Sequence, residues 1–135
     1  MGNNKVWFIT GASKGLGLEL AKKLLAEGFK VAATSRSEAS LITVLGNSSE
    51  NFLPLEMDLV DEKSVKNAIE AAVSHFKTID VLVNNAGLSQ GLDAFHEGNL
   101  DDWDTMIDTN IKGLLYVSRL VSEWMVARKT GHIIN

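Results

Sequence analysis

The chain has 135 residues, of which 45% are hydrophobic and 22% are charged, and its formal net charge is −4. This is the composition of one globular domain, and the negative charge argues against nucleic-acid binding. The chain contains no cysteine, which excludes a disulfide framework and a thiolate metal site, and its three scattered histidines predict no metal site. The polar N-terminus does not fit a signal peptide and no apolar run is long enough for a membrane span, so a cytoplasmic protein is expected.

Short apolar runs alternate along the chain with amphipathic stretches of helical period. The runs predict strands at residues 6–9, 29–34, 52–57 and 79–83, and the beginning of a fifth strand at 131–135. The amphipathic stretches predict helices at 16–27, at 38–45, from an N-cap at Asp61 to 76, and at 100–129.

This alternation predicts a Rossmann-like, doubly wound α/β fold whose parallel sheet has the strand order 3-2-1-4-5. Pro54 cannot donate a backbone hydrogen bond, which places the third strand at an edge of the sheet. We interpret residues 1–135 as one Rossmann domain that is incomplete at its C-terminal side, because the pattern stops within the fifth strand. The helix at 100–129 is apolar on nearly all sides, which predicts cover by the sheet and by a partner helix.

A glycine-rich turn, Thr-Gly-Ala-Ser-Lys-Gly-Leu-Gly at residues 10–17, separates the first strand from the first helix. Backbone N–H groups at the start of a helix have no partner within the helix, and the helix dipole favours an anion there. A second turn, Asn-Asn-Ala-Gly at residues 84–87, follows the fourth strand. In the predicted strand order the two turns meet in one crevice, where doubly wound proteins bind their ligands.

The end of the second strand distinguishes between the two nicotinamide dinucleotides. A site for NAD places an acid here, but residues 34–37 read Thr-Ser-Arg-Ser and the first acid is Glu38. Arg36 and Lys14 offer two positive charges for a 2′-phosphate, and Ser13 and Ser37 can donate further hydrogen bonds. These residues favour NADP over NAD; the alternative is that both cations are ordinary solvated surface charges.

The two turns, together with Asp58-Leu59 after the third strand and Asn110 in the long helix, strongly resemble the classical short-chain dehydrogenases/reductases. The resemblance covers the whole chain and implies hydride transfer between NADP(H) and a carbonyl or alcohol substrate. It implies that the glycine turn holds the pyrophosphate, that Asp58 contacts the adenine, and that Asn110 supports a proton relay as a catalytic residue. The alternative for Asp58 is a helix-entry residue. The cofactor-binding residues implied are Thr10, Gly11, Ser13, Lys14, Gly15, Leu16, Gly17, Ser35, Arg36, Asp58, Leu59, Asn84, Ala86 and Gly87.

The family's catalytic Ser and its Tyr-x-x-x-Lys pair have no counterpart in the sequence. Tyr116 is followed four residues later by Leu120, so we interpret it as a packing residue. The resemblance therefore implies the cofactor-binding half of a reductase, inactive alone, with residues 88–99 on the side of a small-molecule substrate. It also implies a homo-oligomer formed through the long helix 100–129. The alternatives are a nucleotide-binding module without catalysis and an interaction fragment that pairs through this helix.

Overall fold

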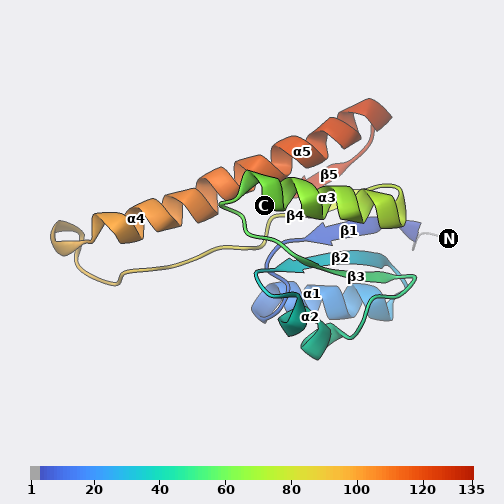
Figure 1. Ribbon diagram of the computed structural model, residues 1–135, viewed down its shortest axis with the longest axis horizontal. Helices are drawn as coiled ribbons and strands as arrows, with labels where there is room; N and C mark the ends of the chain where they lie inside the picture. The colour runs from blue at the N-terminus through green and yellow to red at the C-terminus, as the bar shows by residue number, and fades with distance from the viewer. Residues whose placement is uncertain (1–3) are drawn as a thin grey trace.

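The computed structural model describes residues 4–135 and contains one parallel five-stranded sheet with helices on both of its faces (Figure 1). The strand order is β3-β2-β1-β4-β5, which confirms the predicted order. β3 lies at an edge of the sheet, as Pro54 predicts, and Pro54 pairs in register with Ala33 of β2. The strands are β1 (Val6–Ile9), β2 (Lys30–Ser35), β3 (Phe52–Glu56), β4 (Val81–Val83) and β5 (His132–Ile134).

Helices α1 (Gly15–Ala26) and α2 (Glu38–Leu45) cover one face of the sheet, and α3 (Glu62–Phe76) and α5 (Gly113–Arg128) cover the other (Figure 1). Each of these helices buries apolar side chains against the strands, for example Leu41 of α2, Val65 of α3 and Val117 of α5. The resulting three-layer arrangement confirms the doubly wound architecture.

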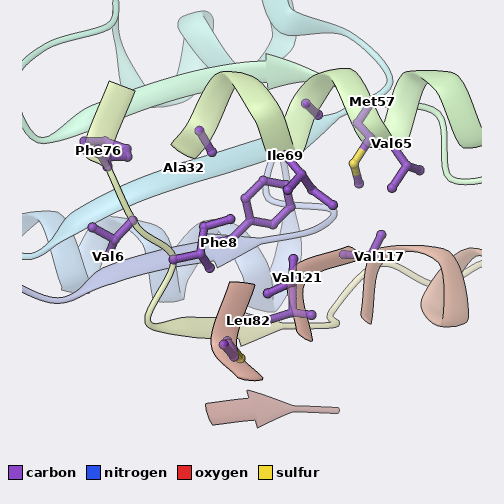
Figure 2. Close-up of a cluster of buried hydrophobic side chains, with 14 residues drawn as sticks. Val6, Phe8, Ala32, Met57, Val65, Ile69, Phe76, Leu82, Val117 and Val121 are labelled. Carbon is purple, nitrogen blue, oxygen red and sulfur yellow. The ribbon is translucent and has the colours of Figure 1, made fainter. Parts of the chain in front are cut away.

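The central strand β1 contributes side chains to both cores, because successive residues of a strand point to opposite faces. Phe8 is fully buried and lies with Ile69, Leu82 and Val121 in the core beneath α3 and α5 (Figure 2). Ile9, the next residue, is fully buried in the core beneath α1 and α2. The carboxyl end of β1 is therefore held from both faces, and it supports the glycine turn that follows.

The predicted long helix is a continuous helical stretch, but it is not a regular α-helix. It consists of α4 (Leu100–Ile107), a π-helical turn η3 (Asp108–Lys112) and α5. Lys112 and Asp108 pair across this turn at 3.1 Å, and the hydrogen bond from Lys112 to Asp108 raises the pKa of the lysine. A π-turn inside a helix frequently marks a functional position, and this one contains Asn110.

Only one side of the long helix is covered by the described residues. α5 packs on the sheet and on α3, whereas α4 projects beyond the sheet (Figure 1) and has no buried residue. Among the described residues, no helix is long and apolar enough to cross a membrane.

Candidate nucleotide-binding site

The two turns predicted to meet do meet, and side chains from both of them join them. The Thr10 hydroxyl accepts hydrogen bonds from the backbone N–H groups of Asn85 (3.1 Å) and Ala86 (3.0 Å). In return, the Asn85 side-chain amide donates to the backbone oxygens of Gly11 (2.9 Å) and Thr10 (3.2 Å). Thr10 is almost completely buried, so these bonds fix the floor of the crevice between β1 and β4.

Gly17 is required by the same contact. A Cβ atom at this position would lie 2.5 Å from the Asn85 side-chain nitrogen and 2.6 Å from the Gly11 oxygen. At Gly15, by contrast, φ is +60° and a Cβ would meet nothing within 4 Å. The glycine turn is therefore closed on the side of the second turn and open on the side where a ligand would approach.

The N-terminus of α1 is open for an anion. Its N-cap, Lys14, makes no side-chain capping bond, and its first turn contains no acid. The helices α2, α3 and α4 are all capped by a side chain, from Ser37, Asp61 and Asn99 respectively. Leu16, in the first turn of α1, is 78% exposed although it is a large apolar residue. Uncapped N–H groups and an exposed leucine fit the pyrophosphate and the sugar of a dinucleotide lying across this turn.

A groove of about 1200 Å³ runs from this turn along the carboxyl ends of the strands. Most of the cofactor-binding residues predicted from the sequence line it, from both turns and from the ends of β2 and β3. They are Gly11, Ser13, Lys14, Ser35, Arg36, Asp58, Leu59, Ala86 and Gly87. The other predicted residues, Thr10, Gly15, Leu16, Gly17 and Asn84, are not in its lining. A groove of this volume is large enough for a sizeable ligand, and nine of the fourteen predicted residues lie together in it.

Positive charge and hydroxyl groups gather where β2 ends. Lys14 and Arg36 both line the groove, and neither forms an ion pair with another described residue. The Ser35 hydroxyl donates to that of Ser13 at 3.3 Å and accepts from the Ser37 N–H at 3.3 Å. Two cations without ion-pair partners, beside two hydroxyl groups that are hydrogen-bonded to each other, form a site suited to a phosphate.

Asp58 does not cap the helix that follows it. The N-cap of α3 is Asp61, as the sequence predicts, and its side chain accepts from the N–H groups of Lys63 and Ser64. Asp58 instead closes a turn by accepting from the Val60 N–H at 3.1 Å. It is exposed in the groove, and its backbone oxygen accepts from the Asp61 N–H at 3.1 Å, so Asp58 both lines the groove and lies at the entry to α3.

Asn84 lies beside the groove, not in its lining. Its side-chain amide donates to the Ser118 hydroxyl of α5 and to the Asn135 side-chain oxygen, both at 3.0 Å. The bonds tie the end of β4 to a helix and to the residue after β5. Asn84 thus supports the sheet, whereas Ala86 and Gly87 of the same turn line the groove.

Both polar atoms of the Asn110 side chain are occupied by one backbone segment. The oxygen accepts from the Leu88 N–H and the nitrogen donates to the Leu88 oxygen, each at 2.7 Å. The side chain therefore holds the loop after β4 against the π-turn. The predicted role of Asn110 in a proton relay stays a prediction.

Sequence reasoning did not single out Ser64 and Gly113, and it treated Asn85 as turn-forming. The Asn-Asn-Ala-Gly motif that contains Asn85 is the sequence feature from which its contact with the glycine turn could have been predicted. Ser64 and Gly113 are ordinary helix residues in the sequence, and only the fold brings them against Asp58 and Leu59.

Tyr116 packs against the core beneath α3 and α5, which confirms its interpretation as a packing residue. Among the described residues, no group of three or more His, Asp or Glu could hold a metal ion.

A family model described as short chain dehydrogenase matches residues 5–135. The chain belongs to this family. The probable NADP-dependent dehydrogenase of Haemophilus influenzae is 46% identical to it over 127 residues, which are 94% of this chain and 50% of that protein. The NADP-dependent 3-hydroxy acid dehydrogenase of Salmonella typhi is 41% identical, over 94% of this chain and 51% of that protein. The chain thus spans about half the length of the curated relatives it matches.

Solved structures of the family share the fold. The closed form of a serine dehydrogenase complexed with NADP+ matches with a TM-score of 0.90 at 36% identity, over 96% of this chain and 52% of that one. A 3-ketoacyl-(acyl-carrier-protein) reductase from Brucella melitensis, complexed with NADH, matches with a TM-score of 0.85 at 30% identity, over 93% of this chain and 53% of that one. Relatives with this fold therefore include proteins bound to either cofactor, and the family alone does not choose between them.

Proposed function

We propose that this chain binds NADP(H) and forms the cofactor-binding half of an oxidoreductase that acts on a carbonyl or alcohol substrate. The observation that carries the proposal is the groove, in which an uncapped helix N-terminus lies beside the two unpaired cations Lys14 and Arg36. The relatives from Haemophilus influenzae and Salmonella typhi, both named as NADP-dependent, support the same cofactor.

Each part of the cofactor has residues suited to it. The first turn of α1 would hold the pyrophosphate, and Arg36, Lys14 and the nearby serines would hold the 2′-phosphate. Asp58 and Leu59 would take the adenine, and Ala86 and Gly87 would lie against the adenosine ribose. NADPH supplies a hydride when bound. The chain's own part is to bind and orient the cofactor, and Asn110 fixes the Leu88 backbone on the proposed substrate side.

A fluorescence titration of the chain with NADPH tests this proposal. We expect saturable binding, with NADH binding more weakly, and no oxidation of NADPH when carbonyl compounds are added to this chain alone. Circular dichroism showing the helical content of the fold is the control that the chain is folded. A folded chain that binds neither dinucleotide would contradict the proposal.

We also propose that two copies associate through the long helix. Three large apolar side chains, Ile107, Ile111 and Leu115, stand four residues apart on it and are 46%, 55% and 57% exposed. Such a stripe is typical of a helix that packs against another helix. Sedimentation should show that the unmodified chain associates. Leu115→Glu should abolish this association. The control Ser48→Glu places the same charge on an exposed loop residue and should retain it. A monomeric unmodified chain would contradict this proposal and leave the cofactor proposal intact.

A further inference from the structure

Helices α3 and α5 form a second hollow, separate from the nucleotide groove. The two helices lie side by side (Figure 1), and a cavity of about 230 Å³ lies between them. Ile69 of α3, which is 2% exposed, lines it together with Leu120, Trp124 and Ala127 of α5. None of these residues lines the nucleotide groove. The α3–α5 hollow can hold one ring or a short aliphatic chain, because an apolar protein cavity of about 150 Å³ is large enough for benzene.

Trp124 gives the α3–α5 hollow a surface that attracts cations. The residue is 44% exposed, although tryptophan is on average a highly buried residue. The face of an indole ring carries partial negative charge, and tryptophan attracts a cation more strongly than the other aromatic residues do. Because Trp124 lines the hollow and is also open to solvent, a ligand in the hollow can reach its ring.

Two carboxylates, one from each helix, add negative charge to the hollow. Glu70 of α3 and Glu123 of α5 both line it and are exposed. Within residues 4–135 each forms one ion pair, Glu70 with Lys66 and Glu123 with Arg119, and both pairs are 3.8 Å long. Exposed ion pairs of this kind contribute little, so both carboxylates are able to bind another cation. Lys66 lines the hollow and Arg119 does not, so the lining carries two negative charges and one positive charge.

We propose that the α3–α5 hollow binds a small organic amine in its protonated form. The apolar part of the amine would lie on Ile69 and Leu120, and its ammonium group would lie near Trp124, Glu70 and Glu123. A neutral molecule of the same shape would lack the electrostatic attraction, and an anion would be repelled by the two carboxylates. This site goes beyond the proposed function. It is also separate from the apolar stripe through which two copies are proposed to associate, since no residue of that stripe lines the hollow.

The probe that tests this proposal is 2-phenylethylammonium, which carries an ammonium group on a ring small enough for the hollow. 2-Phenylethanol has the same ring without the charge, and 3-phenylpropionate has the opposite charge. NMR titrations that follow the indole N–H signal of Trp124, assigned by its loss in Trp124→Phe, measure the three affinities. We expect saturable binding of the ammonium probe with a Kd of about 1–10 mM and binding of the alcohol that is about three- to tenfold weaker. The carboxylate should show no saturable binding.

Substitutions at the carboxylates test which groups bind the ammonium. Glu123→Gln should weaken the ammonium probe by about threefold and leave the alcohol unchanged, because it removes a charge and keeps the size of the side chain. Glu70→Gln tests the second carboxylate in the same way and serves if Glu123→Gln does not fold. Lys66→Gln should strengthen the ammonium probe by about twofold, since Lys66 no longer competes for Glu70. Glu19→Gln is the matched control, because Glu19 is an exposed acid of α1 that pairs with a lysine of its own helix at 3.6 Å.

Equal affinity of the unmodified chain for the ammonium probe and the alcohol would overturn the proposal, because the hollow would then select only for an apolar ring. Absence of saturable binding of the ammonium probe would overturn it as well. A loss in Glu19→Gln as large as that in Glu123→Gln would have the same consequence, since it describes non-specific attraction to a negatively charged chain. None of these outcomes depends on NADPH binding, so the proposed function is tested separately.

Discussion

Replacing Arg36 with alanine is expected to weaken NADPH binding by about 10- to 100-fold and to change NADH binding by less than about threefold. The two cofactors differ only in the 2′-phosphate. Arg36 lines the groove at the end of β2 and forms no ion pair with another described residue, so its charge is available for that group. Fluorescence titrations of both dinucleotides at one fixed salt concentration measure the two losses.

Arg119→Ala is the matched control, because it removes an arginine of α5 that pairs loosely with Glu123 at 3.8 Å on the surface. It should leave both affinities unchanged. If Arg36→Ala weakens NADPH and NADH equally, Arg36 does not bind the 2′-phosphate and the preference for NADP is wrong. Lys14→Ala should produce a smaller loss of selectivity, since Lys14 also stands at the N-terminus of α1 and is placed near the pyrophosphate.

Replacing Thr10 with valine is expected to lower the free energy of unfolding by about 2–4 kcal/mol. Valine has nearly the same shape but cannot accept the hydrogen bonds from the N–H groups of Asn85 and Ala86. Thr10 is 2% exposed, so water cannot easily replace the lost acceptor. Since the second turn is then no longer held against the glycine turn, NADPH affinity should fall as well.

Urea unfolding of the chain, followed by circular dichroism, measures the change in stability. Thr10→Ser retains the hydroxyl and should lose much less stability than Thr10→Val. Thr43→Val should cost less than about 1 kcal/mol, because the exposed Thr43 hydroxyl bonds only to a carbonyl of its own helix. If Thr10→Val has the same free energy of unfolding as the unmodified chain, the hydrogen bonds of the Thr10 hydroxyl do not stabilise the contact between the two turns, and the prediction is wrong.

Most of the cofactor-binding residues predicted from the sequence line the groove, because they occur in short, contiguous motifs. The glycine turn, the Asn-Asn-Ala-Gly turn and Arg36 each follow directly on a predicted strand, and parallel strands bring their carboxyl ends to one edge. Asn84 shows the limit of this reasoning. It belongs to a motif whose other three residues line the groove, yet its own side chain turns away to Ser118 and Asn135.

Asn110 and Gly113 show a second limit. The sequence predicts a helix through both, and the helix exists, but a hydrophobic pattern does not reveal a π-turn at residues 108–112. One extra residue in a helical turn changes which side chains face the neighbouring loops. The contacts of Asn110 with Leu88 and of Gly113 with Leu59 depend on that turn, so they could not be derived from periodicity.

The sequence by itself determined the order of elements, the parallel sheet, the edge position of β3 and the place of the glycine turn after β1. These properties depend on local hydrophobic period, on residues with special backbone requirements and on the right-handed connection of parallel strands. Only the tertiary structure decided how the glycine turn is held. Its partners Asn85 and Ala86 lie more than 70 positions away, and they reach Thr10 because β1 and β4 are neighbours in the sheet. The open N-terminus of α1 was likewise decided by the fold, since whether a helix is capped depends on where side chains point and not on their order in the chain.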